Sequence, residues 1–151
     1  MMAVKVTLTR TIIGGPPKIR FPEKTWRDVG DLVVGDIRER VYKQETIDGG
    51  RIKENAPSTL DSKKRRGKPL KSLIDKMRRF VKKQFFTIAT RKNAVVVGHT
   101  TPDVLRWVQE MGYVDWFGLG PKGAARVRER FVKDINDARN RAAKKRRKVT
   151  P

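Results

Sequence analysis

The sequence has no cysteine and a single histidine, His99. The absence of cysteine excludes disulfides, thiolate metal sites and cysteine nucleophiles, and one histidine is too few for a histidine-rich metal cluster. Phosphate-binding loops of the Gly-x-x-x-x-Gly-Lys-Ser/Thr type, Gly-x-Gly-x-x-Gly fingerprints and His-Glu-x-x-His metal motifs are also missing. Most familiar catalytic constellations are therefore excluded, and we expect a protein that is not an enzyme and needs no cofactor.

Long apolar stretches are missing as well. No window approaches the roughly 18 consecutive apolar residues of a membrane-spanning helix, and the start MMAVKVTLTR lacks the apolar region of a secretory signal. We therefore expect a soluble chain that is not exported by the usual route. With 151 residues, of which 37% are hydrophobic, the chain has material for one domain with a modest core.

What the chain has in excess is positive charge, with 37 Lys and Arg against 16 Asp and Glu and a net charge of +21. This charge is concentrated in two blocks, residues 63–92 and 121–151, while residues 93–120 carry one basic and three acidic groups. Repulsion within each block opposes compaction, and phosphates or an acidic protein face would relieve it. The pattern favours a polyanionic partner, although a solvated, solubilising surface remains the simpler alternative.

The first half of the chain predicts a strand, a helix and a long loop. Val4, Val6 and Leu8 alternate with polar residues, as in a half-buried strand. An amphipathic helix is expected at about residues 25–43, with Thr25 as its N-cap. Its apolar residues Trp26, Val29, Val33, Ile37 and Val41 recur at spacings of three and four. It contains two glycines, Gly30 and Gly35, which weaken an isolated helix. Either tertiary packing stabilises the helix or a neighbour approaches closely at the glycines, or the glycines are simply tolerated. Residues 44–69 are polar and rich in turn signals, and they predict a long, mobile, basic loop.

The second half predicts a hairpin and two helices. Alternation over residues 80–89, a turn at residues 91–93 and the apolar run 94–98 indicate two antiparallel strands. A helix is expected to start at residues 101–103 and to stop at Gly112, with Val104, Leu105, Trp107, Val108 and Met111 as its apolar face. An apolar, glycine-punctuated elbow follows, and a last helix is expected from about Lys122 to the early 140s.

These elements predict an α+β fold: a small antiparallel β-sheet packed by an N-terminal helix and C-terminal helices. We expect residues 1–143 to form one domain. Residues 144–151 are expected to be a basic C-terminal tail that is disordered unless it is bound, because the run 144–148 has nothing to bury.

The candidate residues for contact with DNA or another polyanionic partner are the basic ones of three segments. They are Lys63, Lys64, Arg65, Arg66, Lys68, Arg78, Arg79, Lys82, Lys83, Lys144, Lys145, Arg146, Arg147 and Lys148. Aromatic residues are interleaved with the basic ones at residues 78–86, which is compatible with a stacking surface for nucleic acid, but alternating aromatics on a strand more often belong to a core. Any such binding would be led by phosphates, blind to sequence and weakened by salt.

The remaining titratable residues suggest no chemistry. His99 has no acidic neighbour in sequence beyond Asp103, so a packing or loop role is favoured over a general base. Four carboxylates on the first helix, Asp28, Asp31, Asp36 and Glu39, stand beside arginines and are expected to form solubilising ion pairs.

The order of several short motifs resembles phage virion-morphogenesis and tail-completion proteins, small components of the neck between head and tail. The matching pieces lie between about residues 25 and 131. They are Asp48-Gly49, Ser58-Thr59-Leu60, Gly67-Lys68-Pro69-Leu70, Val96-Val97-Gly98 and the elbow Trp116-Phe117-Gly118-Leu119-Gly120. The sequence departs from the family at residues 71–77, which lack its Asp-Thr-Gly pattern, and at residues 107–112, which lack its His-Gln-Phe-Gly stretch.

The resemblance implies a structural virion component, assembled in the host cytoplasm, that forms a homo-oligomeric ring of six or twelve copies around the DNA channel. Its partners would be portal or adaptor proteins on one side and tail tube or sheath proteins on the other. Tail completion, tail terminator and head-tail connector roles all remain open. The elbow residues Trp116, Phe117, Gly118 and Leu119 would serve assembly. The alternative is a ribosomal or other RNA-binding structural protein, whose composition this chain shares.

Overall fold

A three-stranded antiparallel sheet organises the computed structural model, which describes residues 3–7, 20–74 and 77–149. Its order is β1 (Val4–Thr7), β3 (Ala94–His99) and β2 (Phe86–Arg91), so the hairpin β2–β3 places β3 in the centre. Val97 pairs with Val4 on one side and with Ile88 on the other. Leu8, which was expected to extend the first strand, lies outside the described residues.

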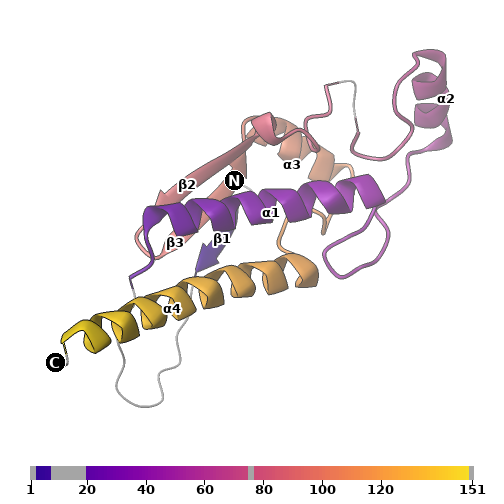
Figure 1. The fold of residues 1–151 in the computed structure, drawn as a ribbon. Helices are drawn as coiled ribbons and strands as arrows, with labels where there is room; N and C mark the ends of the chain where they lie inside the picture. The colour runs from indigo at the N-terminus through magenta and orange to yellow at the C-terminus, as the bar shows by residue number, and fades with distance from the viewer. Residues whose placement is uncertain (1–2, 8–19, 75–76, 150–151) are drawn as a thin grey trace.

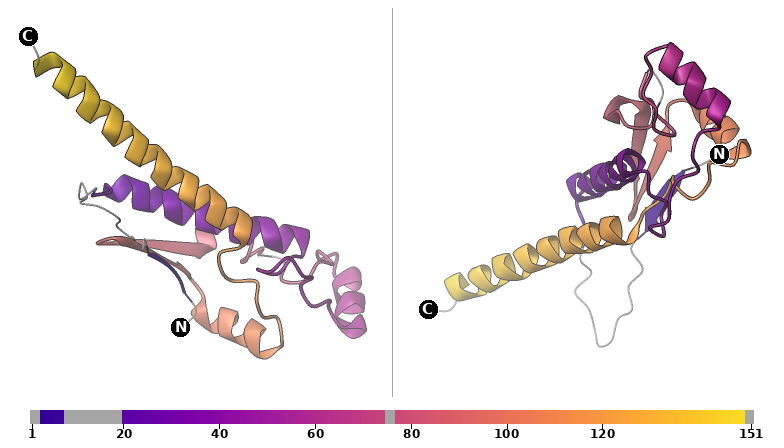
Figure 2. Two further views of the ribbon diagram at one scale, coloured as in Figure 1. Left: turned by 90° about the horizontal axis from the view of Figure 1, so that it is seen from below. Right: turned by 90° about the vertical axis from the view of Figure 1, so that its right-hand side faces the viewer.

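Two long helices lie on one side of this sheet and a short one on the other (Figures 1 and 2). Helix α1 (Glu23–Lys43) packs on the sheet, and α4 (Pro121–Val149) runs antiparallel to α1 along its outer side. Helix α3 (Pro102–Glu110) lies on the far side, where its residues Leu105 and Val108 are buried. The α+β architecture predicted from the sequence is confirmed.

The core lies between α1, the sheet and the elbow that precedes α4. Val29, Val33, Ile37 and Val41 of α1 are fully buried, as the spacing of three and four predicted. Gly30 lets α1 approach the sheet closely, since a Cβ there would come within 2.5 Å of the Ile88 Cγ2 atom. Gly35 has nothing within 4 Å and is simply tolerated.

Several local predictions are wrong. Helix α1 begins at Glu23, and Thr25 is not its N-cap, because its hydroxyl instead donates to Asp134 of α4. The expected strand over residues 80–89 begins only at Phe86, because Phe80 and Val81 are both buried and the chain turns through the 3-10 helix η1 (Lys83–Phe85).

The two segments expected to lack regular structure contain helix. Within residues 44–69, helix α2 (Pro57–Arg65) starts with proline at its first position. The backbones of Glu45 and Arg51 also form an isolated antiparallel β-bridge across a turn. Helix α4 continues to Val149, so residues 144–149 are helical rather than a disordered tail, and residues 150–151 lie outside the description. Alanine, lysine and arginine are strong helix formers, and basic side chains near a helix C-terminus interact favourably with its dipole.

Candidate assembly surfaces

The elbow before α4 is held by a buried ion pair on α1. Trp116 is 1% exposed and Phe117 8%, so their side chains belong to the core. The Arg40 guanidinium donates to the carbonyl oxygen of Trp116 at 2.8 Å and to that of Gly118. Asp36 accepts from Arg40 Nε at 3.1 Å and from the backbone N–H of Gly120 at 2.8 Å.

The elbow therefore positions α4 rather than offering an exposed surface of its own. Gly118 and Gly123 allow this close approach, since a Cβ would meet Ile47 Cδ1 at 2.4 Å at the first position and Asp36 Cγ at 2.5 Å at the second. The prediction that Asp36 forms a solubilising ion pair is wrong. Asp36 and Arg40 lie four residues apart, beside the apolar positions of the same helix face, and this spacing could have indicated that they are buried together.

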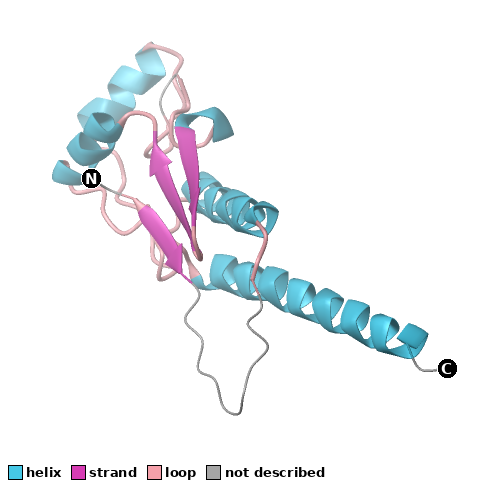
Figure 3. Ribbon diagram, turned by 90° about the vertical axis from the view of Figure 1, so that its left-hand side faces the viewer, coloured by secondary structure: helices cyan, strands magenta, loops and turns pink. Residues whose placement is uncertain are grey.

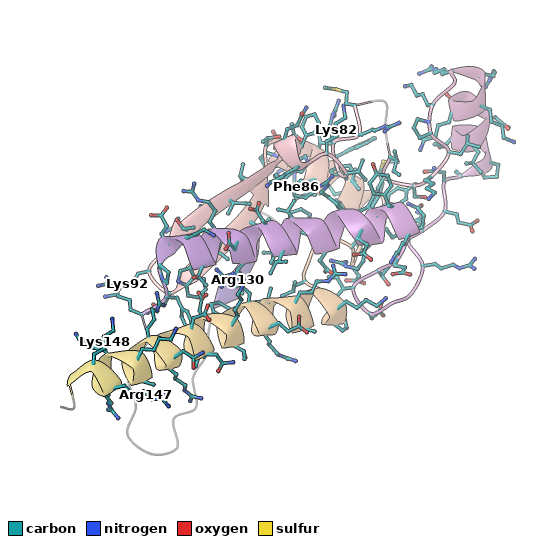
Figure 4. All side chains as sticks on the ribbon, in the orientation of Figure 1. Lys82, Phe86, Lys92, Arg130, Arg147 and Lys148 are labelled. Atoms are coloured by element: carbon teal, nitrogen blue, oxygen red, sulfur yellow. The ribbon has the colours of Figure 1, made fainter. Side chains whose placement is uncertain are left out.

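A second polar cluster ties the middle of α4 to the first turns of α1 (Figure 4). Arg130 donates to Asp28 at 2.9 Å and also to Asp134. The hydrogen bond from Arg130 lowers the pKa of Asp28. Burial would raise the pKa of Asp134, but the hydrogen bonds from Thr25 and Arg130 outweigh it and lower that pKa. Farther toward the elbow, hydrogen bonds from Lys43 and Arg126 hold the pKa of Glu39 at about 2.

The first basic segment lies on and after α2, at the end of the molecule away from the C-terminus (Figure 1). Lys64, Arg65 and Arg66 are exposed there. Lys63 is less exposed because its ammonium donates to the carbonyl oxygen of Lys71 at 2.9 Å. Part of this segment therefore holds the chain itself together.

The second basic segment, residues 78–83, lies beside the sheet and is partly used within the fold. Lys83 forms an ion pair with Asp31 of α1 at 2.8 Å, and the Arg79 carbonyl lies 3.0 Å from His99 Nε2. Lys82 and Arg78 are exposed. His99 is 7% exposed and packs beside Phe80 and Phe86, which agrees with its predicted packing role.

The third segment is the end of α4, and it projects beyond the rest of the molecule (Figure 3). The described side chains of residues 139–148 are all exposed. Residues 139–149, which we call the arm, carry seven basic and no acidic residues. At 1.5 Å per residue the arm is about 16 Å long. The three basic segments are thus not brought together, because α2 and the arm lie at opposite ends of the molecule (Figure 1).

The aromatic residues at positions 78–86 do not form an exposed stacking surface. Phe80 is 4% exposed and Phe86 8%, and Phe86 stacks on Phe117 with ring centroids 6.2 Å apart. Phe85 is half-buried, and its ring stacks on that of His99 with centroids 6.3 Å apart. Phe80 and Phe86 are core residues, as the alternation of aromatics favoured.

One exposed apolar surface was missed from the sequence, and it lies on α3. Trp107 is 58% exposed and Met111, four residues later at the helix end, is 45% exposed. Asp103 and Glu110 flank them with side chains 92% and 67% exposed. The prediction that Trp107 and Met111 belong to the buried face of this helix is wrong, because Leu105 and Val108 occupy that face.

A cavity of about 500 Å³ lies between the start of α1 and the β2–β3 turn. Phe21 and Trp26 form its apolar wall, and Arg20, Arg91 and Lys92 line its rim. Among the described residues, no three His, Cys, Asp or Glu side chains are placed to hold a metal ion. Within the same residues, no helix is both long and apolar enough to cross a membrane.

No family model, curated protein or solved structure matches this chain.

Proposed function

We propose that this chain is a structural subunit of a tailed-phage neck, of the tail-completion, terminator or head-tail connector type. It would form a ring of six or twelve identical copies around the DNA channel, between portal or adaptor proteins and the tail tube or sheath. The order of the short motifs from Asp48 to Gly120 supports the family, and the α+β fold is compatible with it.

The observation that carries the proposal is the arm of α4. This helix end carries seven basic and no acidic residues, and its described side chains are exposed, so a concentrated positive charge lies outside the core. The repulsion within this charge would be relieved where phosphates or an acidic surface lie against it. Such an element suits a subunit that is completed by neighbouring copies or by the DNA of the channel.

The test is the state of the purified full chain in solution. Native mass spectrometry and negative-stain electron microscopy should find closed rings of six or twelve copies at high protein concentration. A chain that stays a compact monomer at every concentration would overturn the proposal.

The alternative, an RNA-binding structural protein, is favoured by the exposed cations at both ends of the molecule. Stacking of RNA bases on the aromatic side chains Phe80 and Phe86 is disfavoured because both are buried. A monomer that binds structured RNA with a steep salt dependence, and binds it better than duplex DNA, would favour this alternative.

A further inference from the structure

The acidic and apolar surface of α3 complements the basic arm of α4. Asp103, Trp107 and Met111 follow one another at intervals of four residues, so they share one face of the helix, with Glu110 beside them. This face combines a large exposed aromatic ring, a flexible thioether and two exposed carboxylates. Exposed apolar groups rimmed by charge are typical of surfaces that bind another protein.

The charge of this surface is unusual in a chain with a net charge of +21. Residues 93–120 carry Asp103, Glu110 and Asp115 against Arg106 alone. Arg106 lies 3.9 Å from Asp103 and 3.8 Å from Glu110, which are weak contacts on an exposed helix. Lys53 is a further cation beside α3, with its Nζ atom 2.9 Å from the Met111 carbonyl oxygen.

The arm offers the opposite chemistry. Two of its seven cations precede Ala142 and Ala143 and five follow them, and these small side chains leave room for a large ring to lie against the helix. The carboxylates of α3 can then accept hydrogen bonds from lysine and arginine side chains at the edges of the contact.

The two surfaces cannot meet within one chain. The arm continues α4, which lies with α1 on one side of the sheet, whereas α3 lies on the opposite side (Figures 2 and 3). A contact between the arm of one copy and α3 of the next joins two different surfaces. Interfaces of this kind are heterologous, and they generate a closed ring when the rotation between copies closes.

We propose that the arm of α4, residues 139–149, docks on the Asp103–Trp107–Glu110–Met111 face of α3 in a neighbouring copy of this chain. This inference rests on the proposed ring but goes further, because it names the two surfaces that build it. Trp107 is the central anchor, and the ion pairs around it set which partner is accepted.

Fluorescence quenching by acrylamide measures the exposure of Trp107 directly. The chain has three tryptophans, of which Trp26 and Trp116 are 3% and 1% exposed, so acrylamide added to the monomer should quench Trp107 almost alone. Dilution of the full chain from ring to monomer should raise the quenching, and the W107F variant should lose this change. Oligomers in which Trp107 stays as accessible as in the monomer would overturn the inference.

Cysteine cross-linking identifies the partner surface, since the natural chain has no cysteine. The M111C variant combined with A142C or A143C samples two sides of the arm and, with a short bismaleimide, should give a ladder of covalent multimers. The matched control pairs M111C with V132C, because Val132 is 52% exposed on α4 outside the arm and should give no ladder. Rings without a ladder in either arm variant would overturn this inference and leave the proposed ring intact, whereas a permanent monomer would overturn both.

Charge reversal tests the complementarity. The D103K/E110K variant should weaken self-association about tenfold, and the added substitutions R141E/K145E on the arm should restore it. The control D61K/E129K changes the net charge equally at exposed sites away from both surfaces and should have little effect. Failure of the arm reversal to rescue D103K/E110K would show that another surface receives α3. Circular dichroism of each variant verifies that the fold is kept.

Discussion

At the scale of single residues, the buried pair of Asp36 and Arg40 does the most to fix the structure. Arg40 is 6% exposed and Asp36 3%, and their side chains form hydrogen bonds with backbone atoms of the elbow at Trp116, Gly118 and Gly120. Burying two charges is costly, so the pair is favourable only because its hydrogen bonds are satisfied. Loss of one partner leaves the other charge buried and uncompensated.

We therefore expect R40M to destabilise the fold by about 3 kcal/mol, measured by urea denaturation. D36N/R40M should cost less than R40M alone, because the amide oxygen still accepts from Gly120 and no unpaired charge remains. R27M serves as the control, since the ion pair of Arg27 with Glu23 is exposed, and its stability should stay close to that of the natural chain. Equal losses in R40M and R27M would contradict this assignment.

The two glycines of α1 provide a second test at the same scale. G30A should be destabilising by about 1 kcal/mol or more, because its methyl group would overlap the β-branched Ile88 and cost more than the gain in helix propensity. G35A should instead stabilise the chain by up to about 1 kcal/mol, since the space around Gly35 is open. Thermal unfolding of both variants checks the opposite signs, and a stabilising G30A would be inconsistent with the close packing of α1 on β2.

At the scale of elements, the contact between α1 and α4 depends on ionised carboxylates. The pKa values of Asp28, Glu39 and Asp134 are all lowered, mainly by hydrogen bonds from Arg130, Lys43 and Thr25 respectively. A carboxyl group whose pKa is lower in the folded chain than in the unfolded chain stabilises the fold at pH values above its unfolded pKa. This stabilisation is lost as the pH falls through its folded pKa.

For Glu39 the relevant window runs from pH 4.5 down to about 2. Acid should therefore loosen α4 from α1, with a falling midpoint of thermal unfolding below pH 4.5. The E39Q variant should show a smaller fall over this window. An unchanged pH profile would argue against the pairing of Glu39 with Lys43 and Arg126.

The sequence predicted these elements unevenly, for physical reasons that differ by residue. The stripe Val29, Val33, Ile37 and Val41 predicted α1 because its period matches a helix with one buried face. Residues 57–65 were interpreted as loop because they have almost no apolar residues, although Pro57 is well suited to a first helical position. The alternation over residues 80–85 imitated a strand, but Phe80 and Val81 both face the core.

The candidate surfaces were only partly accessible to such reasoning. The basic runs are evident in the composition, but their separation to opposite ends arises because α1 leads toward α2 at one end of the molecule and α4 runs antiparallel to α1 toward the other (Figure 1). The face of α3 was missed because both sides of a short helix rich in apolar residues fit a buried stripe. Only the packing of Leu105 and Val108 distinguishes the inner side from the outer one.

At the scale of the whole molecule, the net charge of +21 opposes folding through repulsion among basic groups. We expect added sodium chloride to raise the midpoint of thermal unfolding by a few degrees, because salt screens this repulsion. The K144Q/K145Q/R147Q variant should gain less from salt, since part of the repulsion is already removed from the arm. A midpoint that falls with salt would mean that attractive ion pairs dominate instead.

Removal of the arm separates folding from association. A chain that ends at Ala138 should keep the stability of the full chain, because residues 139–148 are exposed and contribute nothing to the core. The same chain should lose self-association in sedimentation experiments. A truncated chain that unfolds more easily would show that the arm supports its own body.

The continuity of α4 has a mechanical consequence. Beyond Gly123 the helix contains neither glycine nor proline, and its 29 residues form a rod about 43 Å long. Its first half is held to α1, by Asp36 at Gly120 and by the contacts of Arg130 with Asp28 and of Thr25 with Asp134. A tilt of the whole rod on α1 by about 10° would displace the tip by roughly 7 Å. In an assembly built through that tip, the curvature between copies would be governed by a hinge deep inside each subunit. Substitutions at Gly118 or Gly123 would then alter the diameter of the particle without touching any contact between its members.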